Sequence, residues 1–400
     1  MTTDHVSHQS LSVSFEYPIY FTSDTLNPAN SCLACVIARR EPWRRHRVCA
    51  ILDQNVAEAC PLLSIDFQRY VQSHSDQLES AAPPLRVPGG EAAKNEPGVL
   101  KIVQDHLAGL DFDRQSVVVV IGGGAVLDMT GYAAATTHRG VRLVRLPTTV
   151  LSQDDAGVSV KNGVNAYGRK NYFGTFSPPF AVINDGHFLA TLSRRDTIAG
   201  MSEAVKAALI RDGEFFGWIA DHADGLLDGR MDDVSTLVRR SAALHVQHIA
   251  GCGDPFEQGN ARPLDFGHWA AHKLEALSGY ELRHGEAVSI GVALDTLYSC
   301  RAGFLKPEAA RAVIALLGHL GLPLWHEALA QDDLLDGLRE FREHLGGELK
   351  ITLLSGIGEG FEIDRIETDL MLAALDDLRA VSHAPYRSTK PRTVEAGSDR

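Results

Sequence analysis

The sequence predicts an α/β fold, with a Rossmann-like parallel sheet in the first half of the chain and a mostly helical second half. Apolar runs of strand length alternate with helical patterns as far as Leu146, which is the order that β-α-β units produce. From about Ser193 onward the apolar spacing is mostly helical. Because 400 residues exceed what one ordinary hydrophobic core holds, we expect two domains. We place them at residues 1–190 and 191–382, followed by a polar, disordered tail over residues 383–400.

The individual elements follow from apolar runs and from their spacing. Residues 10–21 (SLSVSFEYPIYF) predict an opening strand or hairpin. Further strands are expected over residues 47–53, 85–87, 116–121 and 141–146, with helices over residues 56–74, 97–110 and 125–137. In the second domain, helices are expected over residues 198–210, 235–251, 267–277, 285–303 and 308–321.

Charge and composition limit the classes of partner. The formal net charge of −13 argues against nonspecific binding of nucleic acid, which needs a basic face. No apolar run reaches the roughly 18 residues of a membrane span, and the N-terminus lacks the pattern of a secretory signal. The six cysteines, including a lone CxxC at Cys32 and Cys35, are interpreted as reduced thiols. We therefore expect a cytoplasmic protein that binds neither nucleic acid nor membranes.

Three consecutive glycines directly after a predicted strand indicate a nucleotide site. In VVVVIGGGAVLD, residues 122–124 join the strand to the next helix, where backbone amides and the helix N-terminus favour a pyrophosphate. The spacing departs from GxGxxG, so a tight turn without a ligand stays an alternative. Asp53 and Asn55 follow the preceding strand, and Thr148 and Thr149 end the next one at the same sheet edge. Together these residues predict a dinucleotide site.

The polar stretch over residues 152–179 carries cations and amides. It contains Lys161, Asn162, Asn165, Arg169, Lys170 and Asn171, and Arg139 precedes the adjoining strand. Arginine offers bidentate geometry to a dianionic phosphate, and lysine offers a point charge. A solvated loop would also explain the composition, but not two Lys-Asn pairs framed by glycines. We interpret the stretch as a phosphate-binding segment.

The helical half contains candidates for a metal site. Glu203 and Lys206 stand three residues apart on one predicted helix, which a simple ion pair would explain. His268 and His272 share one face of another helix, and His284 follows soon after. A carboxylate with two histidines, leaving one position open, is a common catalytic zinc arrangement. Spacing alone favours His268 and His272 as the ligand pair, although each histidine could instead be a satisfied core residue.

Ten short motifs occur in order between about residues 47 and 360. They are GGEAAK (89–94), GGGAVLD (122–128), RG (139–140), PTT (147–149), VKNGVN (160–165), RKN (169–171), SEAVK (202–206), FGHWAAH (266–272), HGEAV (284–288) and LKITLL (349–354). In this order they resemble the dehydroquinate-synthase-like sugar phosphate cyclases. The resemblance implies an NAD cofactor, a zinc ion with Co2+ as an alternative, a sugar phosphate substrate and a homodimer.

The resemblance also implies a role for each matching position. NAD binding falls on Asp53, Asn55, Glu91, Lys94, Gly123, Gly124, Asp128, Thr148, Thr149, Asp155, Lys170 and Thr191. The zinc ligands fall on Glu203, His268 and His284, so that His272 faces the substrate and the choice from spacing alone is overruled. Contacts to phosphate and polyol fall on Arg139, Lys161, Asn171, Lys206, His272 and Lys350.

Departures from the family pattern point to a particular branch. In dehydroquinate synthase an arginine, an asparagine and a lysine help to hold the substrate carboxylate. Aligned without gaps, their positions here hold Ala261, Asp265 and Gln247, with Arg262 one residue out of register. A buried carboxylate left unpaired costs several kcal/mol, on the order of 3–5. We therefore expect a pocket that rejects a carboxylated substrate, with Asp265 accepting hydrogen bonds from sugar hydroxyls.

The resulting hypothesis is a secondary-metabolic cyclase that acts on a sugar phosphate without a carboxylate, such as sedoheptulose 7-phosphate. The family chemistry is transient oxidation by NAD+, β-elimination of phosphate, return of the hydride and intramolecular aldol closure. One alternative is authentic 3-dehydroquinate synthase, and another is a metal-dependent polyol dehydrogenase, which would release NADH. From a different class, a noncatalytic module with a degenerate fold would not hold zinc.

Overall fold

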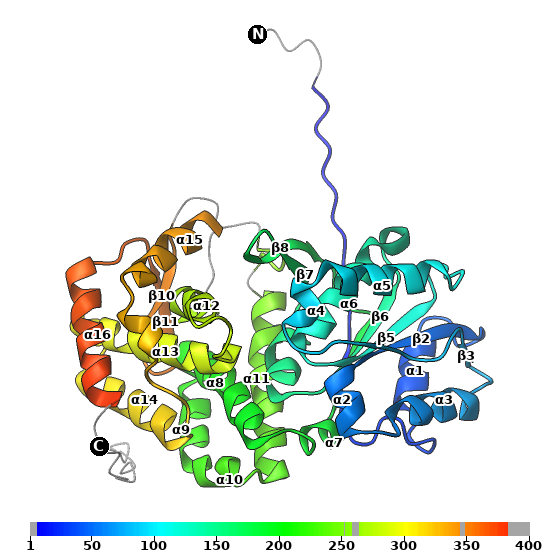
Figure 1. The fold of residues 1–400 in the computed structure, drawn as a ribbon, viewed down its shortest axis with the longest axis horizontal. Helices are drawn as coiled ribbons and strands as arrows, with labels where there is room; N and C mark the ends of the chain where they lie inside the picture. The colour runs from blue at the N-terminus through cyan, green and yellow to red at the C-terminus, as the bar shows by residue number, and fades with distance from the viewer. Residues whose placement is uncertain (1–5, 252, 258–263, 345–348, 383–400) are drawn as a thin grey trace, which may run out of the picture.

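The computed structural model of this chain describes most of its sequence. The described residues are 6–251, 253–257, 264–344 and 349–382. Figure 1 shows a sheet with its own helices on the right and a group of packed helices on the left. None of the helices in these ranges is both long and apolar enough to cross a bilayer.

The first half is built on one parallel sheet, as expected. Its strands are β1 (Ile19–Thr22), β2 (His46–Asp53), β3 (Leu78–Ser80), β4 (Leu85–Val87), β5 (Val117–Gly122), β6 (Arg142–Pro147) and β9 (Ala181–Asp185). The order is β1-β9-β6-β5-β2-β3, with β4 also paired to β2, and each of these pairs is parallel. The predicted α/β class is therefore confirmed.

Both faces of the sheet are covered by helices. These are α1 (Cys32–Ala38), α2 (Gln54–Ala59), α3 (Leu63–Ser73), α4 (Ala92–Asn95), α5 (Pro97–Ala108), α6 (Gly124–Thr136), the short η1 (Thr137–Arg139) and α7 (Gly186–Leu189). In β5, Val117, Val119 and Ile121 join one hydrophobic cluster, while Val118 and Val120 join the cluster on the other face. A strand buried on both faces reads as a continuous apolar run, which is why this strand was predictable.

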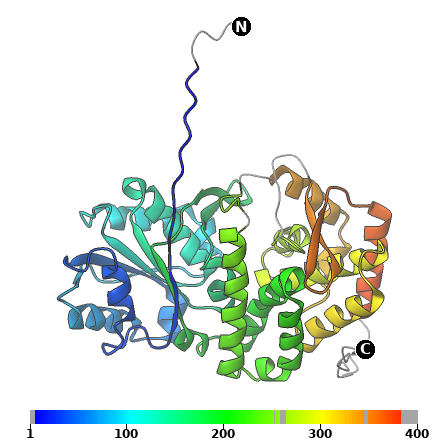
Figure 2. The same ribbon diagram turned by 180° about the vertical axis from the view of Figure 1, so that it is seen from behind.

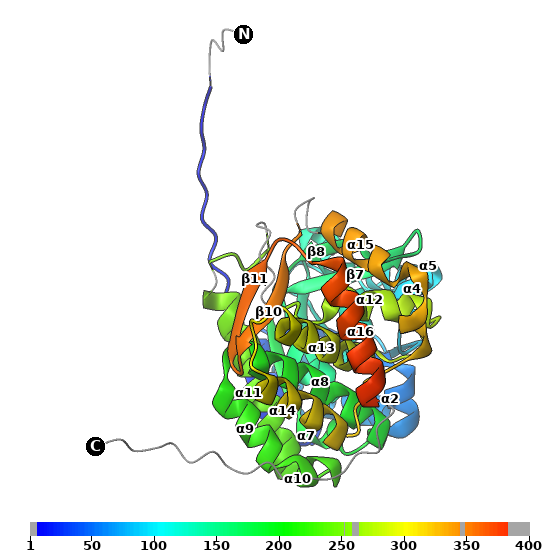
Figure 3. The ribbon, with the colours of Figure 1, turned by 90° about the vertical axis from the view of Figure 1, so that its left-hand side faces the viewer.

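Two expected elements of the first half differ from the structure. Within residues 10–21 only the end is a strand, because Pro18 offers no N–H for a ladder and residues 6–16 are exposed. Figures 1–3 show this segment extending away from the body of the protein. The helix expected over residues 56–74 is divided into α2 and α3, because Pro61 cannot continue a helix.

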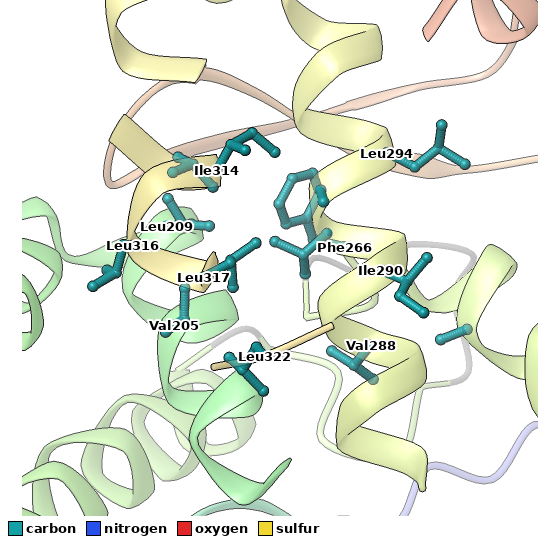
Figure 4. Packing of buried hydrophobic residues seen from close by; sticks show 14 of the residues in the cluster. Val205, Leu209, Phe266, Val288, Ile290, Leu294, Ile314, Leu316, Leu317 and Leu322 are labelled. Carbon is teal, nitrogen blue, oxygen red and sulfur yellow. The ribbon is translucent and has the colours of Figure 1, made fainter. Parts of the chain in front are cut away.

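The second half is mostly helical around one hydrophobic core. Its elements are α8 (Arg194–Arg211), α9 (Gly213–Asp221), α10 (Ala223–Leu227), α11 (Met231–Gly251), α12 (His268–Leu277), α13 (His284–Arg301), α14 (Pro307–His319), η3 (Glu327–Ala330), η4 (Asp332–Leu335), α15 (Asp336–His344), β10 (Ile351–Gly356), β11 (Glu359–Ile363) and α16 (Thr368–Ser382). Figure 4 shows α8, α13 and α14 contributing Leu209, Leu294 and Leu317 to the core, next to Phe266. The proposed division near residue 190 stays a prediction, supported by these separate clusters.

Two features of the arrangement place the site. Figures 1 and 2 show α11 at the centre of the molecule, between the sheet and the other helices. Figure 3 shows the β10–β11 hairpin and α16 on the outer face of the helical half. The helices α8, α11, α12 and α13 therefore lie nearer to the sheet half than the β10–β11 hairpin and α16 do.

The polar stretch between residues 152 and 179 is structured. It forms a short π-helix, η2 (Ser152–Ala156), and an antiparallel hairpin of β7 (Lys161–Ala166) and β8 (Arg169–Phe176). Ala166 pairs with Arg169 across Tyr167 and Gly168, which both have positive φ, at 54° and 71°. Positive φ at both central residues is the geometry of a type I′ turn, which matches the twist of hairpin strands.

Candidate active site

A polar cavity of about 520 Å³ lies where the sheet half meets the helical half. It brings together thirteen of the predicted site residues: Glu91, Lys94, Gly124, Asp128, Asp155, Lys161, Lys170, Asn171, Lys206, Asp265, His268, His272 and His284. Another hollow, of about 680 Å³, is lined mainly by apolar residues of α13 and α14 and contains none of these residues. We therefore place the candidate site in the polar cavity.

The glycine turn is held in place by Asp53. β5 ends at Gly122 and α6 begins at Gly124. The Asp53 carboxylate accepts hydrogen bonds from the N–H of Asn55 at 2.9 Å and of Gly123 at 3.4 Å. A Cβ atom on Gly122 would lie 2.9 Å from the Asp53 Cβ, so a larger residue does not fit there. Burial raises the pKa of Asp53, and the N–H donors oppose that rise.

Lys94 ties the sheet half to the β7–β8 hairpin. Its Nζ donates to Asp128 Oδ2 at 2.7 Å and to Asn171 Oδ1. The N–H of Asn171 donates to Asn165 Oδ1 at 2.8 Å, and Asn165 Nδ2 donates to Glu91 Oε2 at 3.1 Å. The predicted residues Glu91, Lys94, Asp128 and Asn171 thus belong to one hydrogen-bonded network.

Lys170 connects the hairpin to the helical half. Its Nζ lies 2.7 Å from Glu275 Oε1 in α12 and 3.7 Å from Glu91 Oε1. Burial lowers the pKa of Lys170, but the two carboxylates outweigh burial and leave that pKa raised. Lys170 is therefore a charged cation at the border of the two halves.

Glu203, His268 and His284 form the predicted carboxylate–histidine cluster. The distance from Glu203 Oε1 is 3.5 Å to His268 Nε2 and 3.6 Å to His284 Nε2. The three ligand atoms lie within 4.8 Å of one another. The ion pair between Glu203 and Lys206, which was the simpler interpretation, is also present and uses the other carboxylate oxygen, Oε2.

The atoms that face inward fit a metal ion. Glu203 Oε1 is buried and has no hydrogen-bond partner. The outward nitrogen of each histidine has an acceptor: His268 Nδ1 lies 3.3 Å from Phe266 O, and His284 Nδ1 lies 3.1 Å from Glu275 Oε2. Because a carbonyl and a carboxylate only accept, each Nδ1 carries a proton, and each Nε2 is the ring atom that faces the cluster. One oxygen and two imidazole nitrogens are a donor set that suits zinc.

Burial and neighbouring charges shift the pKa of each residue in this cluster. Burial raises the pKa of Glu203, but Lys206 and His284 outweigh it and bring that pKa to about 2. Burial and Lys206 hold the pKa of His268 well below its usual range. Burial lowers the pKa of His284, but Glu275 overcomes this and raises that pKa to about 9. Glu203 is therefore an anion balanced by Lys206 and the protonated His284, and a bound zinc ion would take the place of the Nε2 proton of His284.

Two glycines let the helices approach closely enough to form the cluster. Gly285 follows His284, and a Cβ atom there would lie 1.9 Å from a backbone oxygen of α8, the helix that carries Glu203. Gly267, which precedes His268, has a φ of 78°, and its Cβ atom would lie 2.5 Å from a backbone nitrogen of α13. Only glycine fits both positions without a backbone shift.

The wall of the cavity around His272 holds acidic and basic groups together. The rings of His268 and His284 lie 5.4 Å and 6.0 Å from the ring of His272, so His272 stands beside the cluster, and its role toward a substrate stays a prediction. Burial lowers the pKa of Lys206, but Glu203, Asp155 and Asp265 outweigh burial and raise it. Asp265 therefore lies close enough to influence the charge of Lys206.

One ion pair and one carboxylate–histidine contact also line the cavity. Lys161 Nζ lies 2.5 Å from Glu257 Oε1, and Asp155 Oδ1 lies 2.7 Å from His245 Nδ1. Burial raises the pKa of Asp155, but His245 outweighs it and the pKa is lowered. His248 also lines the cavity, and burial together with Arg211 lowers its pKa to about 4.

Some predicted residues lie outside the cavity in the described structure. Arg139 is exposed at the end of η1, and Lys350 stands half-buried just before β10. The Thr191 hydroxyl donates to Phe188 O at 2.7 Å. Thr148 is buried at the end of β6, and the Thr149 hydroxyl donates to Ser152 Oγ at 2.9 Å. The roles assigned to these residues stay predictions.

The substitutions behind the branch prediction have mixed outcomes. Asp265 lines the cavity, as expected. Gln247 is exposed on α11 and does not line it, whereas His245 and His248 on the same helix do. Ala261 and Arg262 lie outside the described residues. Asp265 is thus the one of these positions that the described cavity contains, and the part given to Gln247 stays a prediction.

Sequence reasoning missed several residues of the cavity wall. Glu275 follows His268 and His272 at helical spacing (i+7 and i+3), so its place on their face could have been read from the sequence. Glu257 and His245 gave no such signal, because each pairs with a residue of a distant segment.

The fold and the site together describe a two-part enzyme, with a nucleotide-type sheet half facing a carboxylate–histidine cluster. Models of the C-terminal and N-terminal parts of 3-dehydroquinate synthase match residues 200–342 and 84–199. The 3-dehydroquinate synthase of Acinetobacter baylyi is 33% identical over 363 residues, which are 90% of this chain and 94% of that protein. The chain belongs to the 3-dehydroquinate synthase family of sugar phosphate cyclases.

Two further relatives are named 2-epi-5-epi-valiolone synthase. The 2-epi-5-epi-valiolone synthase of Streptomyces glaucescens is 36% identical over 273 residues, which are 66% of this chain and 69% of that one. A solved structure of 2-epi-5-epi-valiolone synthase from Streptomyces hygroscopicus subsp. jinggangensis 5008, with NAD+ and Zn2+ bound, is 27% identical. The match covers 94% of this chain and 99% of that chain, with a TM-score of 0.83.

Proposed function

We propose that this chain is a cyclase for a sugar phosphate that lacks a carboxylate, such as sedoheptulose 7-phosphate, and that it releases inorganic phosphate while closing a carbocycle. Its similarity to two 2-epi-5-epi-valiolone synthases supports this branch. A homodimer and a cytoplasmic location, both expected from the sequence, belong to the same proposal.

Glu203, His268 and His284 would hold a zinc ion, and the edge of the sheet would hold NAD+. When bound, these groups supply Lewis acidity and reversible hydride acceptance. The buried, unpartnered Oε1 of Glu203 supports the metal assignment. The amides at the start of α6, together with Glu91, Lys94, Asp128 and Lys170, support the assignment of the dinucleotide.

The observation that carries the branch assignment is Asp265 in the cavity beside Lys206. A substrate carboxylate at this place would meet the Asp265 carboxyl group and the nearby Glu203 and Asp155, whose pKa values are lowered by neighbouring cations. A sugar hydroxyl would instead donate a hydrogen bond to Asp265. The charge of the wall thus favours an uncharged head group.

The other end of the substrate would meet cations. Lys161 and Asn171 line the cavity and offer donors to a phosphate, while Arg139 and Lys350 are assigned to the same group by the family resemblance. A group that already faces the cluster would transfer the proton of a bound hydroxyl. His272 stands beside both histidine ligands, within reach of a hydroxyl bound there.

A second candidate is 3-dehydroquinate synthase itself. The relative from Acinetobacter baylyi, 33% identical over 90% of this chain, favours it. In that case a positive group of the wall, such as Lys206, would have to balance the substrate carboxylate near Asp265.

Phosphate release distinguishes the candidates. Protein loaded with Zn2+ and NAD+ is given sedoheptulose 7-phosphate and, separately, the carboxylated heptulosonate phosphate. Release from the first alone supports the proposal, whereas release from the second alone makes the protein a 3-dehydroquinate synthase. Absorbance at 340 nm is followed in the same reactions, because steady accumulation of NADH would indicate a polyol dehydrogenase.

A further inference from the structure

Glu275 joins two parts of the site that lie far apart in the sequence. Its Oε1 accepts from Lys170 Nζ at 2.7 Å, and its Oε2 accepts from His284 Nδ1 at 3.1 Å. The Glu275 side chain is only 3% exposed. One buried carboxylate on α12 thus contacts both the first residue of α13 and the β7–β8 hairpin.

Glu275 could be mistaken for a metal ligand. Its carboxylate oxygen, a nitrogen of His272 and a nitrogen of His284 all lie within 4.8 Å of one another. The Lys170 ammonium already occupies Oε1, however, and a second cation at this place would be repelled by it. The Nδ1 proton of His284 occupies Oε2, so neither oxygen faces an open position.

We propose that Glu275 is a positioning residue, which fixes the proton of His284 on Nδ1 and so turns its Nε2 toward Glu203. This inference rests on the metal site of the proposed function. A metal-binding histidine commonly donates its other N–H to a carboxylate, which sets the tautomer, orients the ring and makes the ligand nitrogen more basic. Here that carboxylate is itself held by Lys170, so the hairpin fixes the ligand as well.

The chain offers a matched control for this role. Lys273, also on α12, pairs with Glu340 of α15 at 2.7 Å. The Glu340 side chain is 54% exposed, in contrast to Glu275. Glu340→Gln therefore removes a Glu–Lys pair that involves the same helix without touching the histidine cluster.

The test is zinc affinity, measured by competition with a chromophoric chelator for the wild type, Glu275→Gln and Glu340→Gln. A glutamine keeps the shape but can accept from only one of the two donors, and it presents an N–H2 group to the other. We expect Glu275→Gln to bind zinc about 10- to 100-fold more weakly, the usual loss for such a partner of a metal-binding histidine. Glu340→Gln should match the wild type.

A spectroscopic measurement distinguishes a loss of ligand positioning from a general loss of protein stability. The visible spectrum of the Co2+-loaded protein reports the geometry of the ligands, and we expect Glu275→Gln to change it while Glu340→Gln does not. Lys170→Met keeps the partner of His284 and should weaken zinc binding less than Glu275→Gln. If Glu275→Gln does not fold, Glu275→Asp provides the test, since it keeps the charge but cannot reach both donors.

The outcomes distinguish this inference from the proposed function. Zinc bound by all variants with equal affinity and the same Co2+ spectrum would overturn the role of Glu275 and leave the metal site intact. Failure of the wild type and of Glu340→Gln to bind zinc would overturn the metal site, and the inference with it.

Discussion

Arg145 donates a hydrogen bond to Asn162 Oδ1 at 2.5 Å from the interior of the protein. Arg145 is fully buried on β6, and its guanidinium also donates to the backbone oxygens of Gly157, Ser159 and Lys161 at 3.1, 2.6 and 3.1 Å. One side chain thus supplies donors along the whole segment from η2 to β7. The segment ends at Lys161, which lines the cavity, so the position of that lysine depends on Arg145.

Arg145→Met should therefore strongly destabilise the protein. Methionine fills much of the volume but leaves four acceptors without their donor, and each buried unsatisfied group costs about 1–3 kcal/mol. We expect the free energy of unfolding in urea to fall by at least about 3 kcal/mol. Arg339→Met, at a side chain that is 68% exposed, is the control and should change little. Equal stability of the two variants would contradict the role given to Arg145.

How far the fold could be predicted depends on how each strand is buried. β2, β5 and β6 read as apolar runs, and they were expected within a residue or two of their bounds. The β7–β8 hairpin was missed because its strands are polar and rich in glycine, and β8 is mostly exposed. Its only local signal was the turn at Tyr167 and Gly168.

The candidate site, like the fold, could be predicted only in part. Glu203, His268 and His284 lie together as expected, because the motifs that carry the family resemblance identify these three positions. Contacts between distant segments, such as Lys161 with Glu257, follow from the tertiary fold and leave no pattern in one sequence. The side of α11 that faces the cavity, which carries His245 and His248, could not be read from an alignment of single positions.

Asp265→Asn should relax selectivity against carboxylated substrates. The amide removes one anion from the cavity wall and can donate to a carboxylate, while it still accepts from a hydroxyl. We expect the ratio of kcat/KM for sedoheptulose 7-phosphate over the heptulosonate phosphate to fall at least tenfold, or about 1.4 kcal/mol. An unchanged ratio would show that Asp265 does not select the substrate.

Gly285→Ala tests whether the close approach of α8 and α13 forms the metal site. The added Cβ atom would lie 1.9 Å from a backbone oxygen of α8, so one helix has to move. Because Glu203 and His284 lie on these two helices, we expect weaker zinc binding together with a lower melting temperature. Gly217→Ala, where a Cβ atom meets nothing within 4 Å, is the control. Zinc affinity equal to that of the wild type would mean that the helices separate without disturbing the ligands.

Asp295 should make stability depend on pH. It is fully buried in α13, accepts from Trp269 Nε1 at 2.9 Å and from the Gly267 N–H at 3.0 Å, and burial raises its pKa to about 7. An aspartate in the unfolded chain has a pKa of about 3.9, so between these values the folded state binds more protons than the unfolded state. The contribution of Asp295 to the free energy of unfolding is therefore largest at low pH and is lost as the pH rises toward 7.

Asp295→Asn isolates this effect. Asparagine does not titrate, and although it loses the hydrogen bond from Gly267, that loss is the same at every pH. Urea unfolding of both proteins at pH 5, 6 and 7, with a chelator present to exclude metal, gives the difference in stability at each pH. We expect the advantage of the wild type over the variant to shrink by up to about 1 kcal/mol for each pH unit. Parallel profiles would mean that Asp295 stays ionised throughout, held by its two donors against the cost of burial.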